Sequence, residues 1–121
     1  AMVRFSRLKV IPEGGARVKL IDGIPVMVAR YNGELKAYIA VCPHKGYVMC
    51  ERSVNGGKLV CPGHGEIFDF ATGEPSKGKA EEPLPRLHLE VRDGDRGSEV
   101  WVELPGEEHR EWVRRVSKPI H

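Results

Sequence analysis

The sequence predicts an all-β fold, an antiparallel β-sandwich or small barrel, with a short helix or arm at its C-terminal end. Three observations lead to this fold class. Turn signals rich in glycine and proline recur at short intervals along the chain. The segments between them are short, and in several of them apolar and polar residues alternate, as in strands with one buried face. No convincing internal helix pattern interrupts them, so a fold built of short strands is expected.

The length and composition describe one ordinary globular domain. The chain has 121 residues, of which 40% are hydrophobic and 30% charged. No segment approaches the roughly 20 apolar residues that cross a bilayer, and no signal-peptide pattern is present. We therefore expect a cytoplasmic protein that does not associate with membranes. The net charge of +2 and the scattering of basic residues along the sequence argue against nucleic acid as a partner.

The turn signals divide the first 104 residues into short candidate strands. Strands are expected at residues 5–10, 18–21, 26–31, 35–41, 58–60, 67–70, 87–91 and 100–104. The pairs Asp22-Gly23 and Asn32-Gly33 supply the positive φ angles of tight hairpin turns. We take residues 1–104 as the domain, with the functional part at about 40–86.

The sequence changes character after Pro105-Gly106. Acidic residues precede an apolar series with a spacing of four, and basic residues lie toward the end, which is typical of a short helix. The residues concerned are Glu107, Glu108, Trp112, Arg114, Arg115, Val116 and Ile120. We expect residues 105–121 to form an arm that packs back on the domain.

Two loops of the same unusual composition form the candidate site. They read Cys42-Pro43-His44-Lys45-Gly46 and Cys61-Pro62-Gly63-His64-Gly65. Each contributes one cysteine and one histidine, which makes Cys42, His44, Cys61 and His64 candidate metal ligands. The third cysteine, Cys50, lies outside the pattern, and the odd number fits metal ligation better than a disulfide framework.

The choice of metal follows from the mixing of ligand types within each loop. Structural zinc sites usually pair like ligands at spacings such as C-x₂₋₄-C and H-x₃₋₅-H, and the single-residue gap between Cys42 and His44 would be cramped on one ion. A two-iron cluster avoids this problem, since each loop can give its cysteine to one iron and its histidine to the other. A zinc-binding interaction module remains the alternative.

The pattern C-x-H followed by C-x-x-H resembles that of Rieske-type [2Fe-2S] proteins. The resemblance covers roughly residues 3–104 and implies an antiparallel β domain in which two loops hold one [2Fe-2S] cluster. By this resemblance, Cys42 and Cys61 would bind the buried iron, and His44 and His64 the iron nearer the surface. Residues 82–85, Glu-Pro-Leu-Pro, lie where the family has a loop that covers the cluster.

Departures from the pattern refine this expectation. High-potential members of the family carry a further cysteine in each loop, where this chain has Tyr47 and Gly63. They also have serine and tyrosine donors to sulfur, where this chain has Glu66 and Phe68. Because such donors stabilise the reduced cluster, their loss indicates the lower-potential branch of ferredoxins.

The resemblance implies a soluble one-electron carrier of the Rieske ferredoxin type. It would be an electron-transfer protein and not an enzyme, accepting electrons from a reductase and passing them to a terminal oxygenase or another acceptor. We expect a monomer. Besides the zinc module, the remaining alternative is a Rieske-like small subunit of a larger reductase such as nitrite reductase.

Overall fold

The computed structural model describes residues 1–44, 46–49, 54–61, 65–78 and 80–117. The elements of this part of the chain are, in order, β1 (Met2–Arg7), the 3-10 turn η1 (Leu8–Val10), β2 (Gly15–Ile21), β3 (Ile24–Tyr31), β4 (Glu34–Ile39), β5 (Val54–Asn55), β6 (Lys58–Val60), β7 (Ile67–Asp69), β8 (Pro75–Lys77), β9 (Arg86–Leu87), β10 (Leu89–Gly94), β11 (Gly97–Glu103) and α1 (Glu107–Val116). All strand pairs described are antiparallel, which confirms the predicted all-β class. Within these residues no helix is both long and apolar enough to span a bilayer.

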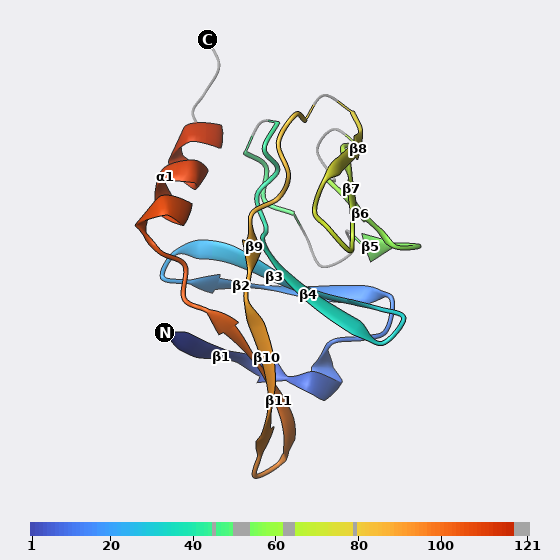
Figure 1. Cartoon of the computed structure of the whole chain (residues 1–121), viewed down its shortest axis with the longest axis vertical. Helices are drawn as coiled ribbons and strands as arrows, with labels where there is room; N and C mark the ends of the chain where they lie inside the picture. Colours follow the sequence, from blue (N-terminus) through green and yellow to red (C-terminus); the bar gives the residue numbers. More distant parts are fainter. Residues whose placement is uncertain (45, 50–53, 62–64, 79, 118–121) are drawn as a thin grey trace.

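The strands described form three sheets. Their strand orders are β1-β11-β10, β2-β3-β4-β9 and β5-β6-β7-β8. In Figure 1 the sheet of β5 to β8 lies at the upper right, and the sheet of β1, β10 and β11 at the lower end. Strands β2, β3 and β4 cross between them, and α1 stands at the upper left.

The central strands separate two hydrophobic cores. The sandwich core consists of Phe5, Ile11, Ile24, Val26, Val28, Ala37, Ile39, Val41, Leu87, Val100, Val102 and Val116. The site core consists of Ala16, Met27, Ala29, Tyr38, Ala40, Cys42, Met49, Leu59, Cys61, Phe68, Phe70 and Leu84. Successive side chains of a strand point to opposite faces, so both cores draw on alternate residues of β3 and β4. This explains why the run from Ile24 to Ala29 is buried throughout.

Two hairpin turns fix the register of the central sheet. Asp22 and Gly23 have φ angles of 51° and 78°, and Asn32 and Gly33 have φ angles of 53° and 79°. Two successive positive φ angles are those of a type I′ turn, whose twist matches that of the flanking strands. Both turns were predicted from the sequence, and the hairpins β2–β3 and β3–β4 are confirmed.

Two predicted strands differ from the structure. The first, at residues 5–10, is shifted, because β1 starts at Met2 and η1 follows Arg7. The second, at residues 87–91, is divided: Leu87 pairs with Ala37, whereas Leu89 pairs with Val102 of another sheet. The chain therefore changes sheets between these two leucines, and Val91, which continues their apolar alternation, is 48% exposed.

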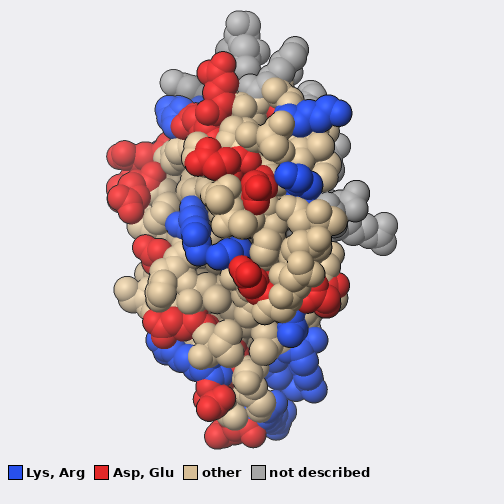
Figure 2. Space-filling view, turned by 45° about the vertical axis from the view of Figure 1, so that its right-hand side comes forward, with Lys and Arg blue, Asp and Glu red and all other residues tan. Residues whose placement is uncertain are grey.

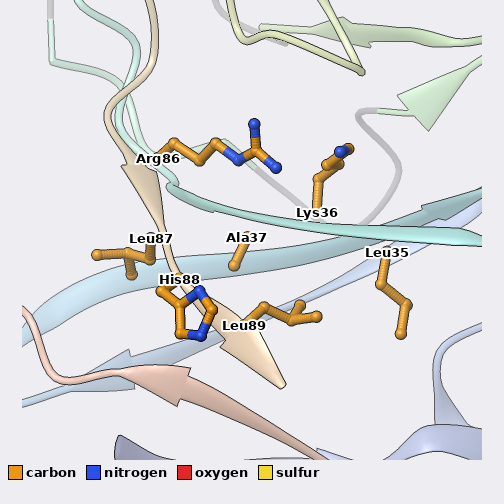
Figure 3. Close-up of a pocket in the computed structure, with 7 residues that line it drawn as sticks. All are labelled: Leu35, Lys36, Ala37, Arg86, Leu87, His88 and Leu89. Carbon is orange, nitrogen blue, oxygen red and sulfur yellow. The ribbon is translucent and has the colours of Figure 1, made fainter. Parts of the chain in front are cut away.

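The change of sheets leaves a cavity of about 440 Å³ beside β4. Figure 3 shows its lining, in which Lys36 and Arg86 lie on one side of the β4 ribbon and His88 on the other. His88 therefore does not face a common centre with Lys36 and Arg86.

The predicted C-terminal helix is present as α1. Two residues of its apolar series, Trp112 and Val116, contribute to the sandwich core, whereas the third, Ile120, lies outside the described residues. At the N-terminal end, the Gly106 N–H donates to Nδ1 of His109 at 2.9 Å, a cap that the sequence analysis did not predict.

Stability at high pH should depend on Tyr38. Its side chain is fully buried, its hydroxyl donates to the Phe70 carbonyl at 2.7 Å, and burial raises its pKa to about 12. An unfolded tyrosine titrates near pH 10. The protonated Tyr38 side chain therefore contributes its full stabilisation below about pH 10. The free energy of unfolding then falls by about 2–3 kcal/mol as the pH rises to about 12.

Urea unfolding across this pH range would measure the loss. Tyr38→Phe should be less stable at pH 8, since the Phe70 carbonyl loses its donor, but should show a smaller decline at high pH. Tyr31→Phe, a change on the neighbouring strand, should keep the wild-type decline. An equal decline in wild type and Tyr38→Phe would contradict the assignment.

Candidate metal centre

The two candidate ligand loops have the same backbone hydrogen bonds. The Cys42 N–H donates to the Tyr47 carbonyl at 2.8 Å, and the Gly46 N–H donates back to the Cys42 carbonyl at 2.8 Å. In the second loop the Cys61 N–H donates to the Glu66 carbonyl at 2.8 Å, and the Gly65 N–H donates to the Cys61 carbonyl at 3.0 Å. Each loop is therefore bounded by a pair of backbone hydrogen bonds that involves its cysteine.

Glycine is required where each hairpin turns back. Gly46 has a φ angle of 75° and Gly65 one of 71°, a region that side chains with a Cβ rarely occupy. The two glycines hold equivalent places, since each donates its N–H to the carbonyl of the cysteine four residues before it. The described residues at the two ends of each loop thus have the same backbone hydrogen bonds.

Strand alternation places both cysteines in the site core. Along the chain from β4, Tyr38, Ala40 and Cys42 face the site core, whereas Ile39 and Val41 face the sandwich core. After β5, Leu59 of β6 and then Cys61 face the site core in the same way. Cys42 and Cys61 are both fully buried and are not joined in a disulfide.

His44 lies nearer the surface than the cysteines, with 20% of its side chain exposed. Its Nδ1 atom lies 3.2 Å from Oε1 of Glu66. The other candidate histidine, His64, and also Gly63 and Cys50 lie outside the described residues. The structure thus places both cysteines in the site core and His44 beside Glu66, which follows the second loop. Among the described residues, no group of three or more His, Cys, Asp and Glu side chains is arranged to hold one metal ion, so the ligand set stays a prediction.

Glu66 is a site residue that the sequence analysis did not identify as functional. It is only 2% exposed, and its Oε2 atom accepts the Ala80 N–H at 3.0 Å. A Cβ atom at Gly78 would lie 1.8 Å from the same oxygen. The carboxylate thus connects the His44 loop, the second hairpin and the segment that follows β8.

The segment after β8 covers the site core. Leu84 is buried there, and its N–H donates to the Gly73 carbonyl at 2.9 Å. The Pro85 carbonyl accepts the Ile39 N–H at 2.9 Å, which holds the segment beside the strand that leads to Cys42. Figure 1 shows it running between the first ligand loop and β8. That residues 82–85 cover a cluster stays a prediction.

The end of α1 contacts both the first ligand loop and the covering segment. Arg115 donates two hydrogen bonds to the Glu82 carboxylate, at 2.7 and 2.9 Å, and these bonds hold the pKa of Glu82 below its usual value. A Cβ at Gly46 would lie 2.5 Å from Cα of Ser117, so the loop and the helix end are in close contact. The helix therefore supports the site from outside.

An antiparallel β domain whose two hairpin loops present buried cysteines beside a histidine is typical of an iron–sulfur protein. The chain belongs to the Rieske [2Fe-2S] domain family, since a model of that family matches residues 2–88. The cofactor of this family is one Rieske-type [2Fe-2S] cluster. The two buried thiols and the partly exposed His44 imidazole are donor types that such a cluster needs.

Similar proteins include ferredoxins of oxygenase systems. Ferredoxin CarAc of Metapseudomonas resinovorans is 29% identical over 79 residues, which cover 65% of this chain and 74% of that protein. The anthranilate 1,2-dioxygenase ferredoxin subunit of Burkholderia cepacia is 31% identical over 70 residues, which cover 58% of this chain and 65% of that protein. The structure of the ferredoxin of carbazole 1,9a-dioxygenase from Nocardioides aromaticivorans has a TM-score of 0.74 at 25% identity and covers 87% of this chain and 99% of its own. The predicted family and fold are confirmed.

Gly78→Ala should destabilise the protein more than Gly97→Ala. The two glycines have nearly the same φ angle, 107° and 108°, so each alanine carries a similar backbone strain of about 1–3 kcal/mol. Only at Gly78 would the new Cβ meet the Glu66 carboxylate, because nothing lies within 4 Å at Gly97. The difference in unfolding free energy, measured with urea, isolates the Glu66 contact.

Adding Glu66→Ser to Gly78→Ala provides the control, since the shorter side chain removes the clash. Part of the lost stability should return. Equal stability of Gly78→Ala and Gly97→Ala would contradict the close approach of the Glu66 carboxylate to Gly78.

Arg115→Gln should loosen the covering segment without unfolding the protein. An exposed ion pair contributes at most about 1 kcal/mol, so hydrogen exchange at the Leu84 amide should accelerate by about three- to fivefold if local opening depends on this pair. Arg114→Gln is the matched control, because Arg114 pairs with Glu107 of the same helix. Equal exchange rates in both variants would show that α1 does not restrain the segment.

Proposed function

We propose that this protein is a one-electron carrier whose [2Fe-2S] cluster is bound by Cys42, His44, Cys61 and His64. When bound, the cluster supplies a reversible one-electron couple. The cysteines would hold the inner iron and the histidines the outer one. The observation that supports this assignment is the difference in burial: both cysteines are fully buried, and the His44 side chain is 20% exposed.

The chain contributes three properties to this role. The site core excludes water from the cysteine side of the site, which lowers the local dielectric constant. The paired hairpin hydrogen bonds fix the backbone around both cysteines. The nearby Glu66 carboxylate adds negative potential when ionised, which opposes the uptake of an electron and agrees with the lower-potential branch.

The redox partners would dock around His44. Tyr47 and Val48 follow this residue and are 46% and 55% exposed, so they offer apolar surface beside the shortest route to the outer iron. Two relatives bear the names of dioxygenase ferredoxins. By analogy we propose a reductase as the donor and a terminal oxygenase as the acceptor, in small transient complexes.

We also propose that residues 1–104 form the domain and residues 105–121 its arm, and that the protein is a monomer in the cytoplasm.

Protein purified without oxygen should contain about two iron and two acid-labile sulfide atoms per chain. It should show a visible absorption spectrum that bleaches reversibly on one-electron reduction. Cys61→Ala and His44→Ala should lose this spectrum, because each removes a ligand, whereas Cys50→Ser should retain it as the control. A colourless protein with stoichiometric zinc and no sulfide would contradict the proposal in favour of the zinc module.

A further inference from the structure

We propose that a second site, far from the ligand loops, binds the phosphate group of a small phosphorylated molecule. The site is a cavity of about 300 Å³ bounded by the end of β1, η1, the end of β3 and the β10–β11 turn. Its lining consists of Arg7, Leu8, Lys9, Arg30, Arg96, Gly97 and Ser98. Four of these residues are cationic, and no carboxylate is among them.

The surroundings of the cavity are also basic. Two adjoining hollows share residues with it, and together the three are lined by seven of the 19 lysines and arginines of the chain. These are Arg4, Arg7, Lys9, Arg17, Lys19, Arg30 and Arg96, with Asp95 and Glu99 as the acidic members. Figure 2 shows lysine and arginine gathered at the lower right of the molecule, toward the end that carries the β10–β11 turn.

Two of the carboxylates nearby are engaged with other groups, whereas Asp95 forms no ion pair within the described part of the chain. Glu99 pairs with Arg4 at 2.9 Å. The Glu13 carboxylate accepts the N–H groups of Gly33 and Asn32, and these hydrogen bonds are the main reason that the pKa of Glu13 lies below its usual value. The charge of Arg30 lowers this pKa less. Within the described part of the chain, no carboxylate forms an ion pair with Arg7, Lys9 or Arg96.

The hydrogen-bond donors of Arg30 indicate that the cavity is suited to a ligand that accepts hydrogen bonds. Its Nε atom is buried and has no hydrogen-bond partner among the described residues. Its Nη1 atom makes only a long contact of 3.4 Å with the Ile11 carbonyl. A buried guanidinium donor without an acceptor is costly, so a small shift of the Arg30 side chain toward an anion in the cavity would be favourable.

The lining selects phosphate among anions. Arg7, Arg30 and Arg96 line the cavity, and a guanidinium group is the side chain best suited to bind phosphate oxygens through paired N–H donors. Ser98 adds a hydroxyl, and Leu8 provides an apolar wall for an organic group attached to the phosphate. The volume of about 300 Å³ exceeds that of one inorganic phosphate, so a phosphate ester or a diphosphate is the class of ligand that it fits.

This site is independent of the proposed electron transfer. In Figure 1 the β10–β11 turn lies at the opposite end of the molecule from the ligand loops and β8. A ligand bound there would not contact a redox partner seated at His44. Phosphate binding can therefore be tested separately, and its failure would leave the electron-carrier proposal intact.

Calorimetric titration of the cluster-loaded protein with pyrophosphate and with ADP, at low and at physiological salt, tests the proposal. We expect saturable one-to-one binding with a dissociation constant below about 1 mM. Arg30→Gln should weaken it at least tenfold, and so should Arg96→Gln, an exposed position that serves as the second variant if the first does not fold. Arg92→Gln is the matched control, because Arg92 pairs with Glu90 and stacks on Trp101 outside the cavity.

The two probes distinguish the source of the phosphate. Tighter binding of ADP than of pyrophosphate indicates a phosphate ester with an organic group against Leu8, and the reverse order indicates a diphosphate group alone. Either result supports the site. Absence of saturable binding at low salt would overturn the proposal, and so would equal weakening by Arg92→Gln. Binding of a DNA duplex that pyrophosphate does not displace would indicate a nucleic-acid surface and would also overturn it.

Discussion

The structure of the site depends on the backbone hydrogen bonds that close two hairpins at Cys42 and Cys61. Each cysteine uses both its N–H and its carbonyl within its own hairpin, so the polar backbone is satisfied where the thiol enters an apolar core. The strands then need only their ordinary alternation to direct both thiols inward. The support from Glu66, Leu84 and α1 is added around this frame.

Much of this arrangement could be predicted, because its signals are local in sequence. A few neighbouring residues are enough to recognise the ligand motif and the ends of α1. The same holds for the turns at Asp22-Gly23 and Asn32-Gly33. The change of sheet after Leu87 could not be predicted, since the apolar alternation continues through Leu89 without interruption. Pairing partners, which decide the sheet, lie far away in the chain.

The site residues that the sequence did not reveal are those whose role comes from tertiary contact. Nothing in the local sequence marks Glu66 as a site residue, except that it occupies a position where the family has a serine. The contact of Gly46 with Ser117 joins residues 71 positions apart. The basic cavity likewise collects cations from β1, η1, β3 and the β10–β11 turn, so residues that look scattered in the sequence become one surface.

The basic cavity lies at the opposite end of the molecule from the ligand loops, which affects how the protein adsorbs. On a negatively charged electrode the end with the β10–β11 turn should attach first and hold the ligand loops toward solution. Electrons would then have to cross most of the length of the protein, and direct voltammetry would be slow. A surface carrying apolar groups, which Tyr47 and Val48 can contact, should orient the molecule the other way and give faster exchange.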